Sequence, residues 1–189
     1  SGEEMVKALV RTAAVAAASG EKDNIETYTL RNMDNAPSSL DVATPLGRDV
    51  LLFGMTNGDI MTYPGSKQSA NAEVNPLRVT HVHDSTITKL RYIKPLEAIV
   101  TSSWDKTLKL TCPETAKNLS TLSGAPDDPD LRHGKSTVDF TFSNPLRLLA
   151  SVGCDRNVLV WNPMMSAPLA SLRGHSAMLQ AIAFDETDG

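Results

Sequence analysis

Three residues in the second half of the chain could together perform nucleophilic chemistry: His133, Ser151 and Asp155. A serine hydroxyl, an imidazole base and a carboxylate are the components of a hydrolytic triad. Such a serine typically occupies an exposed strand-to-helix turn of the type Gly-x-Ser-x-Gly. Ser151 instead lies inside the apolar run LLASVG. We therefore expect no catalytic site and no enzyme activity from these residues.

The elements that position these residues are short β-type runs. Residues 133–175 contain four of them, STVDFTF, RLLASVG, NVLVWN and APLASLRG, and the polar turn Cys-Asp-Arg-Asn joins the second run to the third. The pattern recurs, because His83, His133 and His175 each stand nine residues before an aromatic residue. The third runs recur as NIETY, DIMTY, KTLKLT and NVLVW, and their equivalent positions are Ile25, Ile60, Leu108 and Val158. The resulting spacings of 35, 48 and 50 residues are near the ~40–45 residues of a four-stranded propeller blade.

The unit 133–175 resembles a WD repeat, with Gly174-His175 at its boundary and Trp161 in the dipeptide position, although Asn162 replaces the usual Asp. The resemblance implies an all-β, incomplete WD-repeat β-propeller of about four blades of four antiparallel strands. We expect it to be part of a larger seven-bladed or double propeller, with the rest of the propeller missing from this chain. A closed four-bladed ring is the alternative.

The predicted blade limits follow from the repeat. Residues 1–31 are expected to form the C-terminal part of a degenerate blade, with strands near 13–19 and 24–30. The second, third and fourth blades are then 32–82, 83–124 and 125–174, and residues 175–189 supply the first strand of a fifth. Residues 66–76 are expected to be a polar loop.

The family resemblance implies a structural role for His133, Ser151 and Asp155 instead. In WD repeats four residues form a hydrogen-bonded tetrad, which corresponds here to His133, Ser151, Asp155 and Trp161. A buried imidazole needs partners for both nitrogens, and serine can bridge it to an indole N–H. The third blade offers a partial tetrad of His83, Thr101 and Asp105, with Thr111 in place of the tryptophan. In the second blade Tyr63, Asn57 and Phe53 take the positions of Trp, Asp and Ser.

Trp104 lies in a polar turn, where a role in the core is hard to assign. The WD-repeat propellers that this chain resembles often bind partners on the face that carries such turns. Trp104 is therefore a candidate anchor for a partner protein. An alternative is that its ring folds over its own hairpin. Lys106, Arg132 and Arg156 are further candidates on the same face. We predict a non-catalytic scaffold for protein–protein interactions.

Composition limits the other classes of function. The net charge of −4 and the pI near 5.5 disfavour nucleic acid as a partner. No run is long enough to span a membrane, and no cofactor motif is present. His81 and His83 could share a strand face, but no further metal-ligand side chain has matching spacing, so no metal site is expected.

Two cysteines without a disulfide pattern favour the cytoplasm. A secretory leader at residues 7–20 is the alternative, and an alanine-rich helix is a further one for that stretch. Residues 160–184 also resemble WD-repeat proteins of flagella. The alternative functions are therefore a structural component of a cytoskeletal or ciliary assembly, or the propeller segment of an enzyme complex with catalysis elsewhere.

Overall fold

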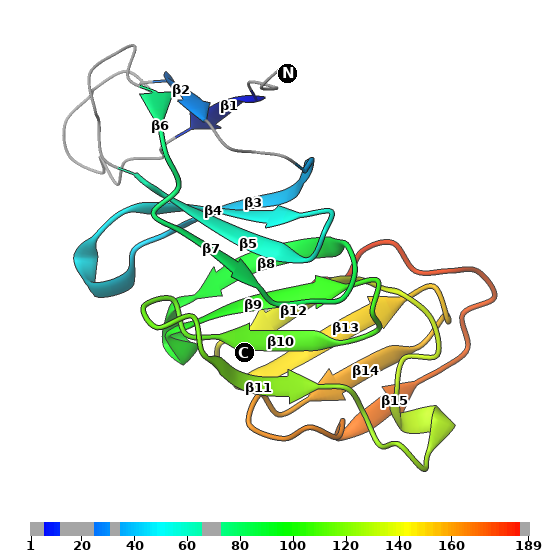
Figure 1. Ribbon diagram of the computed structural model, residues 1–189. Coiled ribbons are helices and arrows are strands. Elements are labelled where there is room, and N and C mark those ends of the chain that lie inside the picture. Colours follow the sequence, from blue (N-terminus) through cyan, green and yellow to red (C-terminus); the bar gives the residue numbers. More distant parts are fainter. Residues whose placement is uncertain (1–5, 12–24, 31–34, 66–72, 186–189) are drawn as a thin grey trace.

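Short apolar runs separated by polar turns fold into strands that pair with their neighbours along the chain (Figure 1). The computed structural model describes residues 6–11, 25–30, 35–65 and 73–185. In these residues the regular structure is β-strand, apart from three 3₁₀ turns: η1 Pro45–Gly47, η2 Lys94–Leu96 and η3 Pro129–Leu131. None of these described helices could cross a membrane. The predicted all-β class is confirmed.

Three antiparallel sheets contain four strands each. The first consists of β3 (Pro37–Ala43), β4 (Val50–Met55), β5 (Asp59–Pro64) and β7 (Arg78–His81). The second consists of β8 (Ile87–Ile93), β9 (Ala98–Ser103), β10 (Leu108–Thr111) and β11 (Asn118–Leu122). The third consists of β12 (Thr137–Ser143), β13 (Leu148–Gly153), β14 (Val158–Trp161) and β15 (Ala170–Leu172). We call the strands of each blade a to d in chain order.

The N-terminal sheet lies where the sequence predicts the C-terminal part of a degenerate blade, and its strands differ from the expected ones. It contains β1 (Val6–Arg11), β2 (Ile25–Leu30) and the two-residue strand β6 (Glu73–Val74), in the order β1-β2-β6. The expected strand 13–19 lies outside the described residues, and the strand described before β2 is 6–11. The expectation that 66–76 is entirely loop is wrong at β6, which pairs in parallel with β2. Three blades of four strands, rather than four, are therefore described.

The sequence predicts that residues 175–189 supply the first strand of a fifth blade, but the described part of this stretch, residues 175–185, contains no strand. A strand is defined by its ladder to a partner strand, and no described strand pairs with this segment. It still packs on the fourth blade, because Leu179, Ile182 and Phe184 lie against a cluster that includes Val152. The Ile182 N–H also donates to Asp139 Oδ2 at 3.0 Å.

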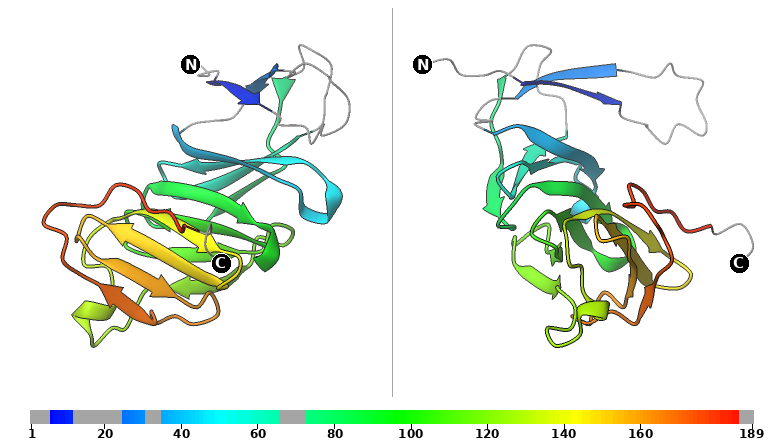
Figure 2. Two further views of the ribbon diagram at one scale, coloured as in Figure 1. Left: turned by 180° about the vertical axis from the view of Figure 1, so that it is seen from behind. Right: turned by 90° about the vertical axis from the view of Figure 1, so that its right-hand side faces the viewer.

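The hydrophobic core lies between blades, because apolar side chains project from both faces of each sheet. One cluster joins the second and third blades through residues such as Leu52, Ile60 and Leu90. A second cluster joins the third and fourth through residues such as Leu110 and Trp161. Figure 2 shows the successive sheets following one another as in a fan. Each blade therefore depends on its neighbours for burial of its faces.

Side chains also bridge the innermost strands of adjacent blades. Ser39 Oγ on β3 accepts the Leu90 N–H of β8 at 2.9 Å, and Asp41 Oδ2 accepts the Tyr92 N–H at 2.7 Å. Between β8 and β12, Lys89 Nζ donates to the Phe140 carbonyl at 2.8 Å. These contacts satisfy backbone groups on strand edges that have no further strand to pair with.

Candidate functional site

The four residues of the predicted tetrad lie together at one end of the fourth blade. Ser151 on β13 accepts a hydrogen bond from Trp161 Nε1 on β14 at 2.8 Å, and its Oγ lies 2.8 Å from His133 Nε2. His133 Nδ1 lies 3.0 Å from Asp155 Oδ2. A neutral imidazole that donates from Nδ1 and accepts the serine proton at Nε2 satisfies every atom of the network.

This network has the atoms of a triad but not the access that hydrolysis needs. Ser151 is fully buried at 0% exposure, and its hydroxyl is engaged by both His133 and Trp161. A nucleophilic serine must face a substrate, with oxyanion donors close to the reacting carbon. The geometry therefore supports a structural network.

The carboxylate end of each network holds two loops together. Asp155 accepts hydrogen bonds from the backbone N–H groups of Gly134 at 2.8 Å and Asn157 at 3.2 Å. Burial alone would raise the pKa of Asp155, but the His133 hydrogen bond, the His133 charge and these N–H groups lower it below its ordinary value. Gly134 precedes strand a and Asn157 follows the b–c turn. The aspartate thus fixes the d–a loop against the b–c turn.

The third blade repeats this arrangement without the indole. His83 Nδ1 lies 2.7 Å from Asp105 Oδ2, and His83 Nε2 lies 2.8 Å from Thr101 Oγ1. Burial would raise the pKa of Asp105, but hydrogen bonds from His83 and Thr107 outweigh it and lower the pKa to about 2. Thr111 stands at the position of Trp161 and is buried, and its hydroxyl has no hydrogen-bond partner. The hydrogen-bonded network of the third blade therefore ends at Thr101.

The second blade replaces the polar network with an aromatic contact. Phe53 and Tyr63 pack edge to face, with ring centroids 5.6 Å apart. Both are buried, and burial raises the pKa of the Tyr63 hydroxyl to about 12. Asn57 still organises its turn, because its side-chain oxygen accepts the Asp59 N–H at 3.2 Å. The three blades therefore share a turn geometry while their buried contacts differ.

The b–c turns share one backbone feature, a positive φ at equivalent positions. These values are 88° at Gly58, 76° at Lys106 and 68° at Arg156. Glycine adopts this conformation readily, whereas lysine and arginine occupy it at a cost. The turn aspartates offset part of that cost through their hydrogen bonds to the backbone. We call the surface formed by these turns and the d–a loops the Trp104 face.

The four candidate partner-binding residues differ in their exposure and in the hydrogen bonds that hold them. Trp104 is 54% exposed, and its backbone N–H is held by the Thr86 carbonyl at 3.0 Å. Arg132 donates to the Pro126 carbonyl at 3.2 Å, within its own loop. Arg156 donates to the Ser176 carbonyl at 3.4 Å. Lys106 is exposed in the same turn as Trp104. Trp104 is therefore the one apolar side chain among the four candidates, and it is half-exposed.

His81 and His83 do not form a metal site. His81 Nδ1 contacts Asp59 Oδ1 at 2.8 Å, while both nitrogens of His83 are occupied by Asp105 and Thr101. In the described part of the chain, no group of three His, Cys, Asp or Glu side chains could hold a metal ion.

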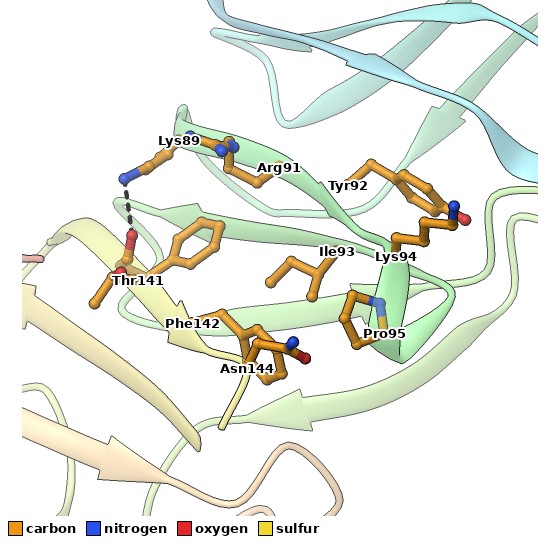
Figure 3. Close-up of a pocket in the computed structure, with 10 residues that line it drawn as sticks. Lys89, Arg91, Tyr92, Ile93, Lys94, Pro95, Thr141, Phe142 and Asn144 are labelled. Atoms are coloured by element: carbon orange, nitrogen blue, oxygen red, sulfur yellow. Dashed lines mark hydrogen bonds between the residues drawn. The ribbon is translucent and has the colours of Figure 1, made fainter. Parts of the chain in front are cut away.

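Sequence reasoning missed a pocket at the opposite end of the strands. It has a volume of about 360 Å³ and lies between β8 and β12 (Figure 3). Lys89, Arg91, Lys94, Ile93 and Phe142 are among its lining residues. Because these residues come from two blades, their proximity follows from blade packing. A signal was present nonetheless, since the adjoining a–b turns all contain the dipeptide Pro-Leu.

Comparison with known proteins identifies the repeat. Residues 74–111, which include His83, Thr101 and Asp105, match the family described as "WD domain, G-beta repeat". The search of curated proteins found no match for the chain.

Solved structures with the same arrangement are similar at low sequence identity. The computationally designed Ika4 protein superposes with a TM-score of 0.65 at 20% identity, over 83% of this chain and 84% of that one. The structure of U3-55K matches with a TM-score of 0.63 at 18% identity, over 80% of this chain and 43% of that one. The RRP9 WD40 repeats match with a TM-score of 0.63 at 18% identity, over 80% of this chain and 42% of that one.

At these identities the likeness to solved structures establishes the fold. The chain spans less than half the length of U3-55K and of the RRP9 repeats. The described four-stranded sheets therefore have the fold of successive β-propeller blades, and residues 74–111 match a WD repeat.

Proposed function

We propose that this chain is a non-catalytic scaffold that binds partner proteins on the Trp104 face. The observation that carries the proposal is a tryptophan exposed by 54% on a turn whose backbone is held rigidly. The next residue, Asp105, accepts the Thr107 N–H at 3.0 Å and binds the buried His83 at 2.7 Å. A rigid turn presents the indole with little loss of conformational entropy on binding.

The chemistry of tryptophan suits this role. Its ring combines a large apolar area with an N–H donor, and tryptophan is enriched among residues that dominate binding energies at protein interfaces. Lys106 adds a positive charge in the same turn. We therefore expect a partner surface with a hydrophobic cavity and an adjacent carboxylate.

The test compares the wild-type protein with Trp104→Ala and with Leu119→Ser. Leu119 is equally exposed at 54% but lies on the outer strand β11, so its variant is the matched control. Proteins that co-purify with each form are quantified by mass spectrometry, and each candidate is then purified and titrated by calorimetry. We expect Trp104→Ala to weaken at least one binary interaction by about 30-fold and Leu119→Ser to leave it unchanged.

Full retention by Trp104→Ala of every interaction that the wild type makes would contradict the proposal. Far-ultraviolet circular dichroism of both variants checks that each is folded. Because the Trp104 ring is half-exposed, its removal leaves the buried network intact.

The alternative is a structural role in a cytoskeletal or ciliary assembly, which is supported by the resemblance of residues 160–184 alone. Co-sedimentation with purified microtubules distinguishes the two. A cytoplasmic location accompanies both proposals, and the free thiols of Cys112 and Cys154 are compatible with a reducing compartment. If the partner recovered through Trp104 is an enzyme, the propeller is the binding segment of an enzyme complex.

A further inference from the structure

The three a–b turns carry a dipeptide that the repeat does not require. Pro45-Leu46, Pro95-Leu96 and Pro145-Leu146 recur at 50-residue intervals. They lie between strands a and b, and therefore at the end of each blade opposite the b–c turns (Figure 1). We call this surface the Pro-Leu face.

Turn chemistry explains the prolines but not the leucines. Proline presets the φ of the first central position of a turn, whereas the second central position favours Gly, Asn or Asp. Leu46 even adopts a positive φ of 50°. Leu96 packs partly against the core, but Leu46 and Leu146 are 81% and 62% exposed. Isolated exposed leucines are ordinary on protein surfaces, and here two of them, Leu46 and Leu146, follow the turn prolines of separate blades.

The pocket of about 360 Å³ runs along β8 and β12 to this face, where it lies beside the a–b turns of the third and fourth blades. Pro95 and Asn144, which line it, belong to the a–b turns of the two blades. Figure 3 shows the Ile93, Pro95 and Phe142 side chains between the strands. The Arg147 guanidinium donates to the Pro95 carbonyl at 3.1 Å and so links the two turns. Apolar side chains therefore form part of the pocket lining, between two connected turns.

The charges around the pocket favour an acidic occupant. Its lining includes three basic side chains and no acidic one. Lys89 and Arg91 are already engaged by Asp139 and Asp41. The exposed Lys94 ammonium makes no ion pair with any described residue.

Two acidic groups limit the positive region. Glu97 and Glu114 act on the Tyr92 hydroxyl, where burial first and these charges second raise its pKa. Neither glutamate lines the pocket. Among the lining cations, Lys94 is therefore the one available to an incoming carboxylate.

From this geometry we propose that the Pro-Leu face binds a segment of a partner protein in which an acidic residue accompanies an apolar one. The apolar side chain enters the pocket between Pro95 and Phe142. The carboxylate pairs with Lys94, and Leu146 extends the apolar contact along the segment. The inference is independent of the Trp104 face, because the two surfaces lie at opposite ends of the strands.

The experiment selects binders from random twelve-residue peptides displayed on phage, using the wild-type protein as bait. We expect the enriched peptides to combine Asp or Glu with Leu, Ile, Phe or Met. A labelled synthetic copy is then titrated by fluorescence anisotropy against four variants: Lys94→Glu, Leu146→Ser, Trp104→Ala and Leu119→Ser. The first two should raise the Kd at least tenfold, and the last two should change it less than twofold.

Other outcomes overturn the proposal. They are the absence of any enriched peptide, enrichment without acidic residues, or an affinity that Lys94→Glu and Leu146→Ser leave unchanged. Circular dichroism and thermal melting establish that both variants are folded, which their exposed positions favour. Vesicles of phosphatidylserine and phosphatidylcholine provide the last comparison. Sedimentation with these vesicles that depends on Leu46 and Leu146, without peptide binding, would show a membrane surface to be the occupant instead.

Discussion

Replacing Ser151 with alanine tests whether its hydroxyl is structural. The change removes one oxygen and leaves two buried groups without a partner, the Trp161 Nε1–H and the His133 Nε2. Each stranded buried group costs about 1–3 kcal/mol, so we expect Ser151→Ala to lower the free energy of unfolding by about 3 kcal/mol. A serine that served only catalysis would cost little stability when replaced.

The third blade supplies the matched control. Thr101→Val keeps the side-chain shape and strands the His83 Nε2, which lies 2.8 Å from Thr101 Oγ1. The Lys109 carbonyl, 3.3 Å from that hydroxyl, keeps its strand partner, because Lys109 and Thr101 face each other across β9 and β10. With no indole in this network, the expected loss is about 1–2 kcal/mol. The difference between the two variants therefore measures the contribution of the indole.

Equilibrium unfolding in urea provides the assay. The chain has two tryptophans, so a Trp104→Phe background leaves Trp161 as the sole reporter of the fourth blade. Equal slopes against urea for all forms would show that the comparison is one of stability. The reasoning is refuted if Ser151→Ala costs less than about 0.5 kcal/mol, or no more than Thr101→Val.

Further predictions concern the turns and the incomplete network. The pKa of Asp105 is lowered from 3.8 to about 2. Its contribution of ~2 kcal/mol to the free energy of unfolding is therefore present above pH 4 and is lost as the pH falls toward 2. In urea titrations the stability of Asp105→Asn should depend less on pH in this range than that of the wild type. A Cβ at Gly58 would lie 1.8 Å from the His83 carbonyl oxygen, whereas one at Gly47 meets nothing within 4 Å. Gly58→Ala should therefore cost about 3 kcal/mol or more and Gly47→Ala about 1, as measured by urea unfolding. Thr111→Val should stabilise the protein by about 1 kcal/mol, because it removes a buried hydroxyl without a partner; a lower melting temperature would contradict this.

Features contained within one blade could be predicted from the sequence. His133, Ser151, Asp155 and Trp161 lie within 29 consecutive residues, and the alternation of a strand decides which of them share a face. Consecutive antiparallel strands then bring them together with no information from the rest of the chain. The missing indole at Thr111 could be predicted in the same way.

Features that depend on contacts between blades could not be predicted. Glu73 and Val74 lie in a polar stretch, and they pair in parallel with β2, more than 40 residues earlier. Two residues carry no hydrophobic period that would indicate a strand. The pocket likewise requires Lys94 and Phe142 to approach from separate sheets. For Trp104 the sequence leaves two alternatives, an exposed ring and a ring folded over its own hairpin, because a turn sequence does not determine how a side chain lies.

The loop before the third blade shows how the Trp104 face is held together although the second blade lacks the tetrad. The Gly58 carbonyl accepts the N–H groups of Val82 and His83, at 3.1 and 3.0 Å, so the d–a loop of the third blade rests on the b–c turn of the second. The side chain of His83 turns the other way and binds Asp105 in its own blade. One residue therefore joins the turns of two blades, through its backbone on one side and its imidazole on the other. The second blade, whose Asn57 has no histidine to bind, obtains its support from the next blade along the chain. Order on the Trp104 face is thus transmitted from blade to blade, and the loss of a tetrad in one blade need not release its turn.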